Sequence, residues 1–176
     1  MTELRAPSES AYEQWLAAVA DFDGTAMDGS GSWTVPDFAV DRRSYEALMT
    51  VIATEGDTST ELAPDRVHCT YFWVFDGPQA DAELVGFVAL RHTIDTPFLR
   101  KAGGHIGYSV RPSRRREGHA ARALRLALAE ARALGIESAL LTCDDTNAAS
   151  AATIETNGGV LENVVEGKRR YWVPTA

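Results

Sequence analysis

The stretch His105–Ala120, HIGYSVRPSRRREGHA, decides the fold, because a strand runs through a short turn straight into a helix. His105–Val110 has strand character, and the basic turn after it contains Pro112. A second strand is expected at 138–143, so the unit is β-α-β, whose two strands run parallel with a right-handed crossover. The helix carries one apolar stripe and ends before a glycine: Ala120, Leu124, Ala127, Leu128, Ala131, Leu134 and then Gly135.

Further strands and a short helix flank this unit. Strand patterns occur at 69–75, 84–93, 160–165 and 169–173, and a short helix is expected from Asn147 to Glu155. The order from residue 67 is therefore β-β-β-α-β-α-β-β. We predict an α/β fold with a mixed, mostly antiparallel sheet and helices on both of its faces.

The first 66 residues predict two helices separated by a loop. The first helix has apolar residues at helical spacing from Tyr12 to Val19, and the second runs from Pro36-Asp37 to Gly56. The intervening segment Asp23–Ser32 contains three glycines and is expected to be irregular. We interpret residues 1–176 as one domain, in which a helical segment at 1–66 precedes a core at 67–173.

Composition and charge exclude several classes of protein. The chain has 176 residues, and 17 basic against 25 acidic side chains give a net charge of −8. An acidic chain repels nucleic acids and anionic membranes over most of its surface, so neither partner is expected. No apolar run approaches the roughly 20 residues of a bilayer span, and no secretory signal is visible near the start. With only two cysteines, the sequence predicts a cytoplasmic protein.

The turn before the long helix is a candidate anion site. Amide groups at a helix N-terminus lack intrahelical partners, and the helix dipole adds positive potential there. A glycine at 118 lets the backbone approach a ligand closely, and phosphate or pyrophosphate is the ligand that such a geometry favours. The alternative is a solvated basic turn with ordinary turn chemistry. Four arginines cluster in the turn: Arg111, Arg114, Arg115 and Arg116.

The segment Arg115–Ala120, RREGHA, matches the [Q/R]-x-x-G-x-[G/A] signature of the GCN5-related N-acetyltransferases, the GNAT superfamily. The strand end at 110–113, the segment from Leu140 to Ser150 and the helix end at 154–159 also resemble this family. The likeness extends over roughly residues 67–173 and is strongest to a bacterial branch. It implies a V-shaped opening between the two central parallel strands, 105–110 and 138–143.

The resemblance implies that acetyl-CoA binds in this opening. Tyr108, Ser109 and Val110 would present strand backbone to the pantetheine and acetyl groups, and Asn147 would hydrogen-bond the pantetheine arm. An N-cap role for Asn147 is compatible with this. The backbone of the signature segment would hold the pyrophosphate: Arg115, Arg116, Glu117, Gly118, His119 and Ala120.

At the expected position of the catalytic acid, the sequence departs from the family pattern. Many relatives have a tyrosine where Ile154 stands, and that tyrosine protonates the leaving thiolate. Isoleucine cannot do this, so Tyr108 and Ser150 are the candidate substitutes. His105 is the candidate base, since an unperturbed histidine pKa of about 6.5 suits the role; the alternative is a structural histidine. His92 is a weaker candidate for the base. The reaction needs no metal, and the histidines show no ligand spacing.

The predicted function is therefore an N-acetyltransferase that moves acetyl from acetyl-CoA directly to a primary amine of a small molecule or peptide. Residues 1–66, the 94–104 loop and the last hairpin are expected to line the acceptor site, in a monomer or homodimer. One alternative is a non-catalytic acyl-CoA-binding or sensor domain that lacks the acid. A nucleotide-binding domain ranks lower, because no Walker A or Rossmann glycine motif occurs.

Overall fold

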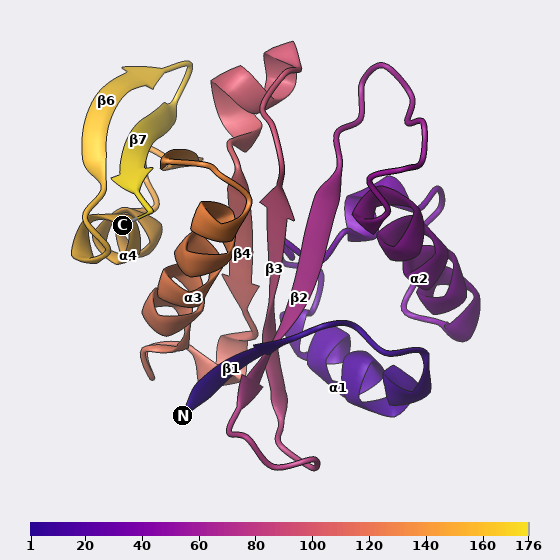
Figure 1. The fold of residues 1–176 in the computed structure, drawn as a ribbon. Coiled ribbons are helices and arrows are strands. Elements are labelled where there is room, and N and C mark those ends of the chain that lie inside the picture. Colours follow the sequence, from indigo (N-terminus) through magenta and orange to yellow (C-terminus); the bar gives the residue numbers. More distant parts are fainter. Residues whose placement is uncertain (176) are drawn as a thin grey trace.

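A computed structural model describes residues 1–175 of the chain (Figure 1). The first of its two sheets has the strand order β1-β2-β3-β4, and every neighbouring pair is antiparallel. Its strands are β1 (Thr2–Arg5), β2 (Cys69–Asp76), β3 (Leu84–Arg91) and β4 (Ile106–Val110). β4 is therefore an edge strand.

The second sheet has the order β5-β7-β6, again with antiparallel neighbours. Its strands are β5 (Ser138–Asp144), β6 (Val160–Val165) and β7 (Lys168–Pro174). The closing hairpin folds back so that β7 lies between its partner and β5. The two sheets thus face each other along β4 and β5, the strands that the sequence placed side by side, but no ladder joins these two within residues 1–175.

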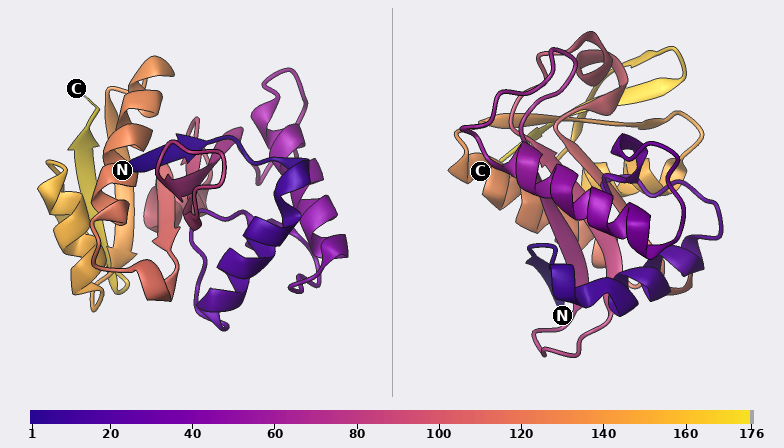
Figure 2. Two further views of the ribbon diagram at one scale, coloured as in Figure 1. Left: turned by 90° about the horizontal axis from the view of Figure 1, so that it is seen from below. Right: turned by 90° about the vertical axis from the view of Figure 1, so that its right-hand side faces the viewer.

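Helices cover both faces of the four-stranded sheet (Figures 1 and 2). α1 (Tyr12–Phe22) and α2 (Arg42–Gly56) pack on one face, against β3 and β2 respectively. α3 (His119–Ala133) packs on the opposite face, and the short α4 (Ala148–Thr156) contacts α3, β5 and β7. The predicted α/β fold is confirmed.

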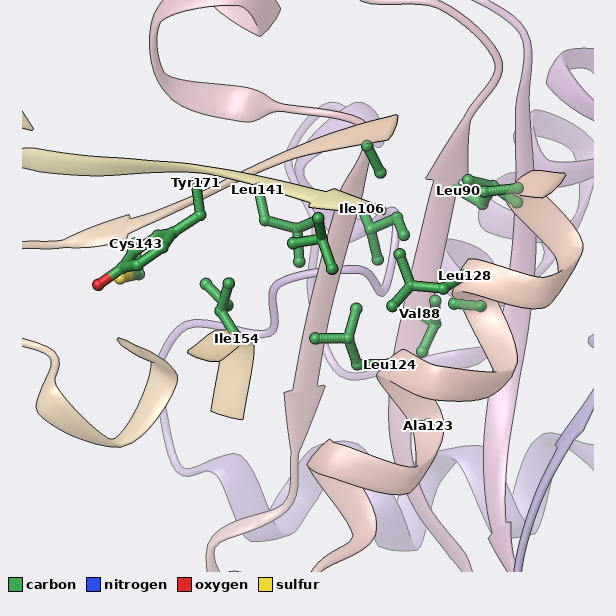
Figure 3. Close-up of a cluster of buried hydrophobic side chains, with 14 of the residues drawn as sticks. Val88, Leu90, Ile106, Ala123, Leu124, Leu128, Leu141, Cys143, Ile154 and Tyr171 are labelled. Carbon is green, nitrogen blue, oxygen red and sulfur yellow. The ribbon is translucent and has the colours of Figure 1, made fainter. Parts of the chain in front are cut away.

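Two hydrophobic cores correspond to these two faces. Trp15, Tyr45 and Trp73 centre the core under α1 and α2. The other core lies between α3 and both sheets, and it joins them across the line where no ladder exists (Figure 3). Its members come from β2, β3, β4, α3, β5, α4 and β7: among them Val88, Ile106, Leu124, Leu141, Ile154 and Tyr171. Burial of apolar side chains, rather than strand pairing, therefore holds the sheets together.

Two elements differ from the sequence prediction. β1 was not predicted, because its sequence TELR has no apolar alternation; it pairs with the far edge of β2. α2 begins at Arg42 and not at Pro36-Asp37, since the Asp41 side chain caps it by accepting a hydrogen bond from the Ser44 amide at 2.8 Å. Within residues 1–175, no helix has the length and apolarity that crossing a membrane requires.

Candidate active site

β4 and β5 touch at one end and then separate. The His105 amide donates to the Leu140 carbonyl at 2.7 Å, and the Leu140 amide donates to Nδ1 of His105 at 2.9 Å. Gly104 makes this approach possible: its φ is +62°, and a Cβ there would lie 2.5 Å from the Leu140 oxygen. Beyond this junction the strands diverge, so the predicted V-shaped split is present.

The open edge of β4 forms one wall of the split. β3 satisfies the other edge, pairing Val88 with Tyr108 and Gly86 with Val110. The backbone toward β5 has no strand partner in the described chain. In the same strand, the Ser109 hydroxyl is buried without a hydrogen-bond partner. Buried polar groups are nearly always paired in native proteins. An extended ligand rich in amide groups would fit this edge.

The N-terminus of α3 lies at the wide end of the split. Gly118 occupies the N-cap with φ +82°, so no side chain caps the helix, and its first turn contains no acidic residue. By contrast, the side chains of Asp41 and Asn147 cap α2 and α4. The free amides and the positive end of the α3 dipole are therefore available to an anion.

The four arginines of the preceding turn have different partners. Arg111 pairs with Asp21 and Glu83, and Arg114 with Asp76, Glu83 and Glu117. Arg115 donates from Nε to the Val110 carbonyl at 3.0 Å. Within residues 1–175, the Arg116 guanidinium has no hydrogen bond or ion pair, and its backbone is left-handed at φ +67°. Two arginines thus fasten the turn, whereas Arg116 keeps its charge available.

The side chain of His119 points into the protein and not toward the anion site. It is buried, and its Nδ1 lies 3.0 Å from the Thr2 hydroxyl of β1. Its other nitrogen lies 3.4 Å from a Glu117 oxygen, which with Asp76 makes a three-residue cluster of potential metal ligands. The Arg114 guanidinium already bridges the two carboxylates, so the cluster is charge-compensated without an ion.

The opposite wall of the split is the start of α4. The Asn147 side chain accepts from the Ser150 amide at 3.0 Å, as expected of an N-cap. The Tyr108 hydroxyl crosses from β4 and lies 3.0 Å from the Ser150 hydroxyl. Burial raises the pKa of Tyr108 to about 12. The structure therefore brings the two candidate acids together across the split, with protons on both at neutral pH.

Two expectations about catalytic groups change with the geometry. Ile154 is fully buried in the core between α4 and the sheets (Figure 3), so an apolar side chain fits the position where many relatives have a tyrosine. His105 is also buried, and burial together with the nearby Arg91 charge lowers its pKa. Its Nδ1 accepts the Leu140 amide hydrogen, so the neutral ring carries its proton on Nε2 and has no free lone pair. This geometry fits the structural alternative for His105 better than the role of base. His92, the weaker candidate, has a side-chain contact with Thr70 at 2.8 Å.

The loop between α1 and α2 lies against β4 beside the split. Gly29 rests on β4, where a Cβ would lie only 2.4 Å from the Gly107 oxygen. A small cavity of about 30 Å³ opens nearby, lined by residues from this loop, from 65–71 and from 96–99, with Trp33, Arg91 and Phe98 among them. The same loop contains Asp28, which the sequence analysis did not single out as a candidate site residue. The glycine-rich segment MDGSGSW around it was the only local pattern that marked this loop.

Comparisons with known proteins agree with this geometry. Residues 2–160 match the family model described as an acetyltransferase (GNAT) domain. A search of curated protein sequences found no match. Among solved structures, the chain is similar to a ribosomal-protein-S5-alanine acetyltransferase from Vibrio fischeri, with a TM-score of 0.68 at 15% identity over 98% of this chain and 91% of that one.

Two further structures share the fold. RimJ from Mycobacterium smegmatis, solved in complex with CoA-disulfide, has a TM-score of 0.68 at 18% identity, covering 98% of this chain and 80% of its own. The PaiA N-acetyltransferase from Thermoplasma acidophilum, solved with coenzyme A, has a TM-score of 0.60 at 13% identity, covering 99% of each chain.

Proposed function

Because this chain belongs to the GNAT acetyltransferase family and is thus an acetyl-CoA-dependent N-acetyltransferase, we propose that it transfers acetyl directly to a primary amine in the split between β4 and β5. One observation carries the proposal: the unpaired edge of β4 leads to the uncapped N-terminus of α3. The amide-containing pantetheine arm matches the open edge of β4, and the pyrophosphate joined to it matches the free amides at the N-terminus of α3.

The proposed cofactor contacts follow the two walls. Backbone amides of the turn and of the first turn of α3, Arg115–Ala120, would bind the pyrophosphate, with the Arg116 charge beside it. Tyr108–Val110 would hydrogen-bond the pantetheine arm through the backbone. Asn147 has its side-chain oxygen engaged by Ser150, so its amide group is what remains for the cofactor. Acetyl-CoA supplies an activated acyl group, and these residues would orient it.

We further propose that Tyr108 and Ser150 together protonate the leaving sulfur. Their hydroxyls lie 3.0 Å apart, and Ser150 also borders Cys143, whose thiol is buried with a raised pKa. The raised pKa of Cys143, due mainly to burial, argues against an acetyl-cysteine intermediate. Direct transfer to the amine is therefore favoured, and the non-catalytic alternative loses its main support because two hydroxyl donors replace the missing tyrosine.

The acceptor is proposed to be a primary amine of a small molecule or peptide. The net charge of −8 favours cationic acceptors over nucleic acids, and the family's activity fits a cytoplasmic bacterial enzyme that acts as a monomer or homodimer.

Calorimetry and a thiol-release assay test this proposal. The protein should bind acetyl-CoA, and at least one amine from a panel of amino-acid amides, alkylamines and polyamines should release free CoA thiol faster than background. Binding without thiol release on any amine would favour the acyl-CoA sensor, and absence of binding would remove the assigned cofactor site.

A further inference from the structure

The loop between α1 and α2 places one carboxylate beside the split. The Ser30 amide donates to the Met27 carbonyl at 3.1 Å, so Asp28 and Gly29 form the tip of a tight turn. Gly29 has φ +83° and lies against Gly107 of β4. Because both contacting residues lack side chains, the turn approaches the strand backbone directly, and Asp28, the neighbour of Gly29, is held beside β4.

The other side of the same turn is also fixed. Ser30 is buried, and its hydroxyl donates to the Ser32 hydroxyl at 2.9 Å. Gly31, with φ +79°, packs so closely on Leu48 and Tyr71 that a Cβ would lie 3.0 Å from each. The position of Asp28 is therefore set by packing on both sides of it.

Three charged groups and one tyrosine, from both sheets, lie near enough to Asp28 to interact with it electrostatically. Arg91 lies at the end of β3, Tyr108 on β4, Asp144 at the end of β5 and Lys168 at the start of β7. The Asp28 side chain stays exposed to water, yet the surrounding protein desolvates it enough to raise its pKa. The carboxylate thus stands where the two sheets diverge.

Neither neighbouring cation forms a direct ion pair with this carboxylate, because each has other partners. Lys168 donates to Asp144 at 2.5 Å, and Arg91 donates to the carbonyls of Gly103 and Gly104 at 3.1 and 3.2 Å. Within residues 1–175, the Asp28 side chain has no hydrogen bond or ion pair. A partly desolvated carboxylate without a partner favours a cation from outside.

We propose that Asp28 is the acceptor-site carboxylate, which binds the ammonium group of the acceptor and takes up its proton before transfer. This proposal rests on the function proposed above. The ammonium gives one proton to Asp28, and the neutral nitrogen then forms a bond to the acetyl carbon as the carbon–sulfur bond breaks. The sulfur leaves as a thiol with a proton from the Tyr108–Ser150 pair. The nitrogen loses its second proton to water, and the pair regains a proton from water.

Asp28→Asn tests this role, because it keeps the shape and removes the charge. Asp81→Asn is the matched control, since Asp81 is an exposed aspartate in the loop between β2 and β3. The probes are alaninamide and n-butylamine, which are cationic at neutral pH, and 2,2,2-trifluoroethylamine, which is largely neutral. Asp28→Asn should lower kcat/KM for the cationic probes by about 10²- to 10⁴-fold, as general bases do. The neutral probe should lose far less, and the acetyl-CoA affinity should not change.

An equal loss on all three probes, or no loss on the cationic ones, would overturn the proposal. A second measurement does not depend on turnover. In carboxyl-labelled protein bound to CoA, the ¹³C resonance missing from Asp28→Asn should titrate above the ordinary range of an aspartate, and n-butylammonium should lower its pKa. A resonance unaffected by n-butylammonium would contradict the role of Asp28. Failure of the wild type on every amine, with acetyl-CoA still bound, would instead count against the proposed function.

Discussion

The two loops that border the split are held in opposite ways and present opposite charges. The turn between β4 and α3 is fastened by ion pairs of Arg111 and Arg114, and it presents free amides and Arg116. The loop between α1 and α2 is held by close glycine contacts and presents the carboxylate of Asp28. With the sites proposed above, an anionic cofactor and a cationic acceptor would be attracted to different sides of one split, which would keep either from occupying the other's site.

The largest effect is expected where the two substrates meet. Tyr108→Phe should lower kcat by about 10²- to 10⁴-fold, the usual contribution of a general acid. The pKa of about 12 means that this hydroxyl keeps its proton across the ordinary assay range, so no alkaline loss of kcat should come from it. Stopped-flow or steady-state thiol release measures the rate, and calorimetry should show unchanged acetyl-CoA binding. Ser150→Ala shows which of the two hydroxyls gives its proton to the sulfur. If Ser150→Ala abolishes turnover while Tyr108→Phe stays active, Ser150 and not Tyr108 is the direct donor.

The next largest effect is expected at the N-terminus of α3, where Gly118→Asp should weaken the binding of acetyl-CoA. A carboxylate there opposes the pyrophosphate, and at a partly desolvated site this costs about 1–3 kcal/mol, or roughly 5- to 150-fold in Kd. Gly118→Asn is the matched control, because asparagine has the same shape and tolerates the φ of +82° that the N-cap requires. The ratio of the two dissociation constants, measured by calorimetry, isolates the charge. Equal affinities for acetyl-CoA would show that the pyrophosphate does not bind at this turn.

These two sides also differ in how far the sequence predicted them. The turn from Val110 to Gly118 follows local rules, because a strand end, a left-handed glycine and an uncapped helix are encoded within a few residues. The place of Asp28 depends on Gly107, nearly 80 positions later, and no local pattern indicates that contact. For the same reason β1 was missed: its pairing with β2 is set by tertiary packing.

Burial explains the remaining differences at the site. The position of Ile154 suggested a lost acid, and its complete burial depends on how α4 packs, which the local sequence does not show. His105 suggested a base from its type and place, yet the hydrogen bond from the Leu140 amide forms only once β5 lies beside it. Secondary structure from residue 67 onward needed no such information, because hydrophobic periodicity determined it.

The acceptor side is tested by Gly29→Ala. A Cβ at this position would lie 2.4 Å from the Gly107 oxygen, so the loop must move off β4 and carry Asp28 with it. Gly24→Ala is the control, because Gly24 has a similar φ of +76° and nothing within 4 Å of its added Cβ. Both variants carry the backbone strain of about 1 kcal/mol, and the clash adds about 1–3 kcal/mol to Gly29→Ala alone. KM for alaninamide should rise in Gly29→Ala only, with unchanged acetyl-CoA affinity; equal KM values would show that the loop does not position the acceptor.

The smallest effect is expected at the contact between β4 and β5, where His105 makes the stability of the protein depend on pH. Burial and the Arg91 charge lower the pKa of His105 in the folded protein, so the unfolded chain binds the proton at a higher pH, near about 6.5. The stability from neutral His105 is therefore complete above that pH and is lost as the pH falls below it. The free energy of unfolding should decrease between about pH 7 and pH 5, by at most about 1.4 kcal/mol per pH unit for one proton.

His105→Asn should flatten this slope, because the asparagine oxygen can still accept the Leu140 amide hydrogen and does not titrate. His105→Ala should also lower stability at pH 7, by about 1–3 kcal/mol, because it leaves that buried amide without a partner. Denaturant unfolding at a series of pH values measures both quantities. A fall in kcat of about 10²- to 10⁴-fold in His105→Asn, with the wild-type stability profile retained, would return the base to His105 and remove that task from Asp28.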